Sequence, residues 1–218
     1  TTYLLPAALR ELTILHPNVD VKIYEGSSEE LFHLLIDGEV DLIINNQRHP
    51  SPVLEFLPFY RDRLVAVLSP LHPLASQAVS LPGCPLPWID LSLFAGETFI
   101  LQRPDQSSRL YTDQALAYAG IRPTRFYLLE NLEASAQMAA EGLGIAFNFL
   151  GYIQYFSYSK PICYFLIGDP NTFIDYCIIR RKDAYLAPQV ADFIQILHNQ
   201  IAQHAFLTLP QHNKGTYV

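Results

Sequence analysis

The chain has 218 residues, of which 50% are hydrophobic and 16% are charged, and its formal net charge is -7. This length and composition predict a folded protein of one large or two small domains and exclude a disordered chain. The longest basic cluster is Arg180 to Lys182, so we expect that these residues do not themselves grip DNA.

The cysteines and the apolar runs indicate in which cellular compartment the protein is found. Cys84, Cys163 and Cys177 lie far apart, form no CxxC pair and are odd in number, which argues against a disulfide framework or a zinc site. The first residues lack the pattern of a signal peptide, and no apolar run reaches membrane-spanning length. We therefore expect a cytoplasmic protein with no membrane partner.

The first elements are predicted from a change of hydrophobic period. A helical pattern runs from Leu5 to Leu15 and stops at Pro17, and "VDVKIY" (19–24) alternates like a half-buried strand. A helix opens at Ser27, and "VDLIIN" (40–45) follows as a continuous buried strand. Strand, helix and strand with short connections predict a right-handed parallel crossover.

Strands and helices alternate again in the second half. After a strand at 63–69 and a proline-rich stretch, the predicted strands are 98–102, 125–130, 144–149 and 162–167, and the predicted helices are 107–120 and 131–142. A last strand (172–182) and a last helix (190–201) cannot form a core alone, so we expect them to return to the first domain.

These elements predict an α/β protein of two Rossmann-like lobes joined by two crossover segments. Lobe 1 is discontinuous and comprises 1–70 and 171–218, and lobe 2 comprises 71–170. Two segments that cross between α/β lobes form a hinge with a cleft, which is a common place for a small ligand.

"GLGIAF" (142–147) partly matches a dinucleotide fingerprint, but its glycines close a helix where the fingerprint would open one. We interpret it as a helix cap followed by close packing, and we expect no cofactor. No histidine pair has metal-ligand spacing, and no nucleophile elbow, P-loop or calcium loop is present. We therefore expect no metal and no catalytic residues.

Polar side chains gather at predicted element ends. Such ends line ligand sites in parallel α/β lobes, where strands finish and helices begin. The residues with this placement are Ser27, Asn45, Asn46, Gln102, Ser107, Ser108 and Asn148. The alternative for each is a structural role only, because Ser and Asn cap most helices.

Several phrases resemble the effector-binding domain of LysR-type transcriptional regulators. They are "YLLPAALRELTILHPNVDVKIYEGSSEELFHLLIDGEVDLII", "LVAVLSPLHPLA", "SSRLYTDQALAYAGIRP" and "AAEGLGIAF". The resemblance extends to about Gln200 and implies a fold like type 2 periplasmic binding proteins, with an effector cleft between the lobes. It also implies a winged helix-turn-helix domain and a linker helix before Thr1.

The resemblance further implies the positions of effector contacts. They fall at Ser27, at Asn46, at Ser107 and Ser108, and at Asn148. Thr2 is a further candidate, one step past a ligand hydroxyl that the family carries at the end of an earlier strand. Asn148 and Phe149 depart from the family pattern, because many members have an apolar residue followed by proline there.

The leading hypothesis is therefore the ligand-sensing domain of a LysR-type regulator. It binds a small polar or anionic effector, contacts DNA through the N-terminal domain, and forms a homodimer of this domain and a tetramer of the full protein. The first alternative is the solute-binding protein of a transporter, which can have the same fold. The second is an enzyme such as a lyase or dehydratase, which needs a perturbed acid, base or nucleophile in the cleft.

Overall fold

The computed structural model describes residues 4–47, 51–153, 158–169 and 171–203, and these divide into two compact units. Unit 1 comprises the described parts of Thr1–Glu25, Glu29–Arg61 and Asp175–Val218, and unit 2 comprises those of Gly26–Ser28 and Asp62–Ile174. The chain passes between them after Arg61 and after Ile174, where the sequence suggested 70 and 170. The difference at the first passage arises because β3 (Leu64–Leu68) hydrogen bonds within the sheet of unit 2.

The sheet of unit 1 has three strands in the order β1-β8-β2, with the bounds β1 (Leu42–Asn45), β8 (Ile174–Arg181) and β2 (Leu54–Asp62). β1 and β8 run antiparallel, with Ile44 opposite Ile178. Apolar residues of β1 and β8 are buried, so this ladder forms one wall of a small core.

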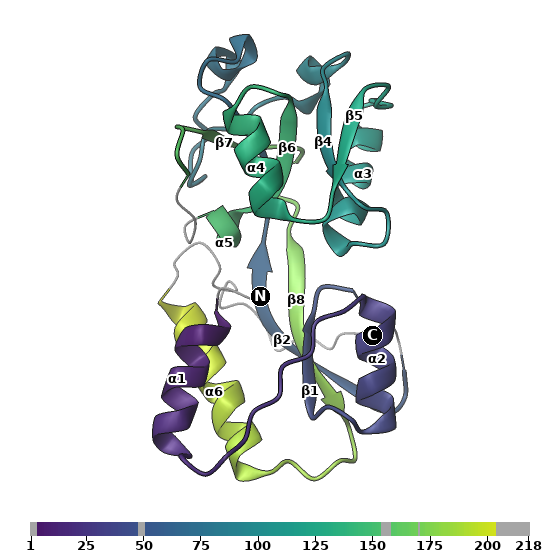
Figure 1. The fold of residues 1–218 in the computed structure, drawn as a ribbon, viewed down its shortest axis with the longest axis vertical. Coiled ribbons are helices and arrows are strands. Elements are labelled where there is room, and N and C mark those ends of the chain that lie inside the picture. Colours follow the sequence, from purple (N-terminus) through teal and green to yellow (C-terminus); the bar gives the residue numbers. More distant parts are fainter. Residues whose placement is uncertain (1–3, 48–50, 154–157, 170, 204–218) are drawn as a thin grey trace. The chain divides into compact units, whose positions relative to one another are not determined.

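The helices of unit 1 are α1 (Leu5–Leu15), α2 (Ser28–Asp37) and α6 (Pro188–Ala202). α1 and α6 lie side by side, as Figure 1 shows. α2 instead covers the sheet, where Phe32 and Leu35 pack against Ile43. Its end is fixed by the Arg181 guanidinium, which donates to the carbonyl oxygens of Leu35 and Val40.

Unit 2 contains a five-stranded sheet in the order β5-β4-β6-β3-β7. Besides β3, the strands are β4 (Phe99–Gln102), β5 (Phe126–Leu129), β6 (Ile145–Phe149) and β7 (Cys163–Leu166). β5, β4 and β6 run parallel, whereas β3 is antiparallel to both of its neighbours. Short helical segments complete the unit: η1 (Pro73–Gln77), η2 (Leu91–Phe94) and α5 (Leu150–Ile153).

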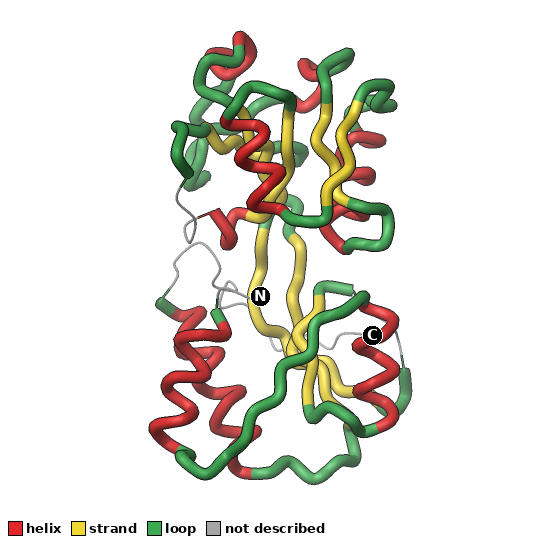
Figure 2. Tube along the Cα trace, in the orientation of Figure 1, coloured by secondary structure: helices red, strands yellow, loops and turns green. Residues whose placement is uncertain are grey.

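Two longer helices cover opposite faces of this sheet, α3 (Ser107–Tyr118) and α4 (Leu132–Ala140), as Figures 1 and 2 show. Leu116 of α3 packs with Phe99 of β4 on one face. Ala136 of α4 packs with Ile100 and Ala146 on the other face. Because successive strand residues point to opposite faces, each of these strands contributes to both layers.

Most of the predicted turn and cap residues are confirmed. Gly38, Gly120 and Gly142 follow helices and have φ angles of 84°, 70° and 78°, the left-handed conformation that glycine adopts at least cost. Asn131 caps α4, with its Oδ1 accepting from the amides of Glu133 and Ala134.

Two predictions in unit 1 are wrong. Residues 19–24 belong to no strand, and the side chains of Val21 and Ile23 are exposed. The sheet of unit 1 consists of β1, β8 and β2 and does not include these residues. The predicted parallel crossover between 19–24 and 40–45 therefore does not form. Conversely, β2 was not predicted, and it carries Pro58 in its interior. Proline is ordinarily confined to strand edges and bulges.

Candidate ligand site at the carboxyl ends of β4 and β6

The parallel strands of unit 2 have a topological switch point. From β4 the chain passes through α3 to β5 on one side, and then through α4 to β6 on the other side of β4. The carboxyl ends of β4 and β6 are therefore neighbours, and the two crossover helices, α3 and α4, cover opposite faces of the sheet. In open α/β sheets, ligands bind at such a place.

Gln102 is the last residue of β4, and its side chain is buried. Its Nε2 donates to Ser135 Oγ at 3.1 Å, and that hydroxyl in turn donates to the carbonyl oxygen of Asn131 at 3.0 Å. Gln102 Oε1 has no hydrogen-bond partner among the described residues. The sheet thus ends on a buried acceptor that is unsatisfied.

Asn148 stands at the corresponding end of β6 and is equally buried. Its Oδ1 accepts from the amide of Phe149 at 2.8 Å, while its Nδ2 has no partner within the described part of the chain. Ile100 of β4 lies opposite Ala146 of β6, so Gln102 and Asn148 follow two residues later on the same face.

The amino end of α3 lies directly beyond β4. Ser107 is its first residue and Ser108 is buried, and the N-cap Gln106 makes no side-chain cap hydrogen bond. The first turn has no acidic residue, and the guanidinium of Arg109 donates to the carbonyl oxygen of Gln102 at 2.9 Å. Backbone N–H groups at such an end favour an anion.

The structure therefore gathers Gln102, Ser107, Ser108 and Asn148 at the strand ends and helix start of unit 2. Ser27 also belongs to unit 2 and immediately precedes α2. Asn46 follows β1 in unit 1 and is buried. Thr2 lies outside the described residues.

Sequence reasoning missed Ser135 and Arg109. Ser135 lies in an alanine-rich helix and gives no signal beyond being a hydroxyl four residues after the cap Asn131. Arg109 follows Ser107 and Ser108 directly, so a cation in the first turn was the available sign.

Asp62 is a further buried polar residue that the sequence did not indicate. Its Oδ1 accepts from the amides of Arg63 at 2.7 Å and Gly151 at 3.0 Å, which ties the end of β2 to α5. Burial raises the pKa of the Asp62 carboxyl from 3.8 to about 6. The Arg63 guanidinium lies over the Phe173 ring, 4.3 Å from its centre.

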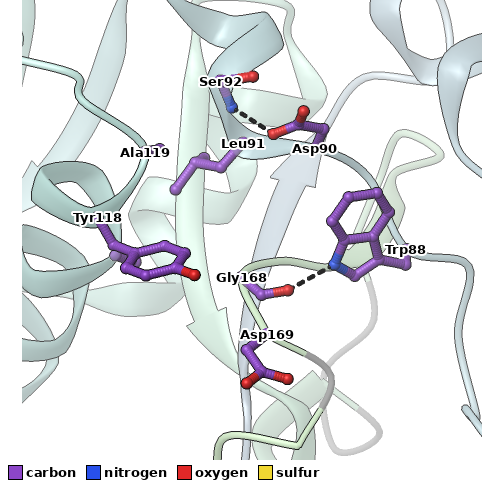
Figure 3. Close-up of a pocket in the computed structure, with 9 residues that line it drawn as sticks. Trp88, Asp90, Leu91, Ser92, Tyr118, Ala119, Gly168 and Asp169 are labelled. Atoms are coloured by element: carbon purple, nitrogen blue, oxygen red, sulfur yellow. Dashed lines mark hydrogen bonds between the residues drawn. The ribbon is translucent and has the colours of Figure 1, made fainter.

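A hollow of about 470 Å³ lies elsewhere in unit 2, near the carboxyl end of α3. Trp88, Leu91 and Tyr118 line it, as Figure 3 shows. Two of its polar groups bond within the protein: Trp88 Nε1 donates to Gly168 O at 2.7 Å, and Asp90 Oδ1 accepts from the Ser92 amide at 2.9 Å.

Among the described residues we also looked for metal ligands, nucleophilic cysteines and membrane-spanning helices. No group of three His, Cys, Asp or Glu side chains there could hold a metal ion. The described cysteines Cys84, Cys163 and Cys177 are free, and burial raises the pKa of the Cys163 thiol, which disfavours its nucleophilic thiolate. No helix among the described residues is long and apolar enough to cross a membrane.

Comparison with known proteins gives consistent matches. Residues 1–202 match the sequence model of the LysR substrate binding domain. The uncharacterized HTH-type transcriptional regulator YbhD of Escherichia coli (strain K12) is 28% identical over 197 residues, which cover 90% of this chain and 59% of that protein. The HTH-type transcriptional regulator CfxR of Cupriavidus necator is 31% identical over 146 residues, 66% of this chain and 43% of that protein.

The solved structures agree on the fold. The BenM effector binding domain with its effector benzoate has a TM-score of 0.76 at 17% identity, and the match covers 98% of this chain and 92% of that one. The effector binding domain of QuiR in complex with shikimate has a TM-score of 0.68 at 20% identity, covering 92% and 91%. The chain thus spans nearly all of these domains but less than two thirds of the curated relatives it matches.

Proposed function

The chain belongs to the LysR substrate binding domain family, and on this premise we propose that it is the effector-sensing domain of a LysR-type transcriptional regulator. Its fold is the α/β, type 2 periplasmic-binding-protein-like fold of that family. The family is one of regulators and not of enzymes, and we propose that the domain binds its effector without converting it. The alternative role in a transporter is not favoured, because the matched relatives are HTH-type regulators.

We propose that the effector is a small polar or anionic molecule held at the carboxyl ends of β4 and β6. The observation that carries this proposal is the juxtaposition of the uncapped start of α3 with the buried, unsatisfied amides of Gln102 and Asn148. The N–H groups of Ser107 and Ser108 are suited to a carboxylate, since a helix start favours negative charge. Benzoate and shikimate, bound by BenM and QuiR, are both carboxylates.

Calorimetric titration of the purified chain with benzoate and with shikimate tests this proposal. We expect at least one of them to bind, and the Ser107→Ala variant to bind it more weakly because the hydroxyl adds a contact to that of the backbone amide. Ser27→Ala is the second variant, because the family resemblance implies a contact there. Unchanged affinity in both variants would remove these two hydroxyls from the site, and no binding by either acid would count against a carboxylate effector.

We propose that the complete protein contacts DNA through another domain and acts in the cytoplasm. The net charge of -7 and the short basic cluster support a separate DNA-binding element. The coding sequence before Thr1 provides the test. We expect it to encode a helix-turn-helix, and a signal peptide or lipid anchor in that place would instead support the transporter role.

We propose that two copies of this domain associate. β5 is the edge strand of its sheet, and Phe126, Tyr127 and Leu128 on it are 47%, 46% and 53% exposed. An exposed apolar edge is a ready surface for a second chain. Light scattering on the purified chain should give the mass of a dimer, and Leu128→Lys should shift it toward the monomer. A monomer before the substitution would contradict the proposal.

A further inference from the structure

A buried hydrogen-bond acceptor lies at the end of β4, and a buried hydrogen-bond donor lies at the end of β6. Gln102 Oε1 is an acceptor and Asn148 Nδ2 is a donor, and neither has a hydrogen-bond partner among the described residues. Their residues are 0% and 1% exposed. Because proteins pair nearly all of their buried polar atoms, two such atoms require an explanation.

The orientation of each amide is determined by its neighbours. Ser135 donates its hydroxyl proton to a carbonyl, so it accepts from Gln102, and the atom that faces it is therefore Nε2. The amide of Phe149 can only donate, so the Asn148 atom beside it is the oxygen. Neither side chain can be turned over without losing its existing hydrogen bond.

The two side chains lie on one face of adjacent strands. Ile100 and Ala146 are paired across β4 and β6, and both pack in the layer that α4 covers. Gln102 and Asn148 are each two residues further along, so they point to that same face at the edge where the strands end. An acceptor and a donor are thus on the same face of adjacent strands, at the same edge of the sheet.

We propose that the ligand of this domain carries a hydroxyl group that donates to Gln102 Oε1 and accepts from Asn148 Nδ2. A hydroxyl performs both roles with one atom, whereas a carboxylate only accepts and would be repelled by the glutamine oxygen. The ligand class is therefore a hydroxylated acid, with its carboxylate toward the start of α3. This inference rests on the proposed function, because it assigns a second group of the same ligand.

The test compares acids with and without a hydroxyl group. Calorimetry on the purified chain would measure the dissociation constants of benzoate, of ortho-, meta- and para-hydroxybenzoate, and of cyclohexanecarboxylate and shikimate. We expect at least one hydroxylated acid to bind about tenfold or more tightly than its parent, because a site built to hydrogen bond a hydroxyl rejects the analogue that lacks it.

Gln102→Met removes the acceptor at similar side-chain length. It should reduce that advantage to about twofold or less. Gln137→Met, at an exposed position on α4, is the matched control and should preserve the advantage. Asn148→Ala is the second variant and removes the donor, with circular dichroism checking the fold of each protein.

The outcomes separate the two levels of the proposal. Equal binding of parent and hydroxylated acids in the unaltered protein would overturn the hydroxyl inference and leave the carboxylate effector standing. An advantage that persists in both Gln102→Met and Asn148→Ala would also overturn it. If none of the acids binds, the carboxylate effector fails, and the hydroxyl inference fails with it.

Discussion

Gln102 Nε2 lies 3.1 Å from Ser135 Oγ, which joins the end of β4 to the first turns of α4. The same serine donates to the carbonyl oxygen of Asn131, the N-cap of that helix. One hydroxyl therefore links a strand end to a helix start across 33 positions of the chain. The bond also holds Gln102 with its Nε2 toward Ser135, and its Oε1 has no hydrogen-bond partner among the described residues.

The first prediction follows from this bond. Ser135→Ala leaves Gln102 Nε2 buried without an acceptor, which should lower the free energy of unfolding by about 1 to 3 kcal/mol. Urea unfolding followed by circular dichroism measures the change. Ser80→Ala, at an exposed position, serves as the control and should have little effect. An equal effect of both replacements would mean that the Gln102 bond is not what stabilises this region.

The second prediction is that the Asp62 carboxyl makes the free energy of unfolding depend on pH. Its pKa is raised from 3.8 to about 6 in the folded protein, so between these values the folded state binds the proton more tightly than the unfolded chain. The stability that this group contributes is fully present below pH 3.8 and is lost as the pH rises through about 6. A shift of this size corresponds to about 3 kcal/mol at most.

Asp62→Asn tests this expectation, because the amide oxygen can still accept from the backbone amides of Arg63 and Gly151. The variant should be more stable than the original protein at pH 7.5 by about 2 kcal/mol, with little difference at pH 4. Asp183→Asn, at an exposed position, is the control. Thermal unfolding across this pH range measures both, and parallel curves for Asp62→Asn and the original protein would contradict the raised pKa.

The sequence predicted the elements of unit 2 well because their signals are local. Gly120 and Gly142 mark the turns before β5 and β6, and the structure confirms their positive φ angles. The pattern at 19–24 was misleading, since alternation marks a strand only where a neighbour offers backbone partners. β2 was missed for the opposite reason: Pro58 weakens the strand signal, yet the ladder forms around it.

In the candidate site, too, the residues with a local sequence signal could be predicted and the others could not. The element ends could be located from capping and period, so Gln102, Ser107 and Asn148 were correctly placed at element ends. Ser135 and Asp62 were not, because their roles depend on burial and on partners far along the chain. Asp62 accepts from Gly151, 89 positions away, and no local pattern carries that information.

The third prediction tests the cap of α4. Asn131→Ala removes the Oδ1 that accepts from the amides of Glu133 and Ala134. It should cost about 1 kcal/mol, the usual effect of losing an N-cap, whereas Asn131→Asp should be nearly neutral because it retains the acceptor. Urea unfolding of the two variants checks this order. Equal stability of the two would show that the side-chain cap contributes nothing.

The last prediction concerns the glycines of "GLGIAF", which we interpreted as a cap followed by close packing. A Cβ added at Gly144 would stand 2.5 Å from the carbonyl oxygen of Thr98, which also accepts from the amide of Ile145 at 2.9 Å. Since the obstacle is backbone, relief requires β6 to move away from β4. Gly144→Ala should therefore cost about 2 to 3 kcal/mol in stability.

Gly142→Ala separates packing from backbone conformation. Gly142 has a φ of 78°, but an added Cβ there would meet nothing within 4 Å. Its replacement should cost about 1 to 2 kcal/mol, the strain of a left-handed alanine, and no more. Thermal unfolding of both variants should rank Gly144→Ala as the more damaging. The reverse order would mean that the cap conformation, and not the contact between β4 and β6, is what requires glycine in this segment.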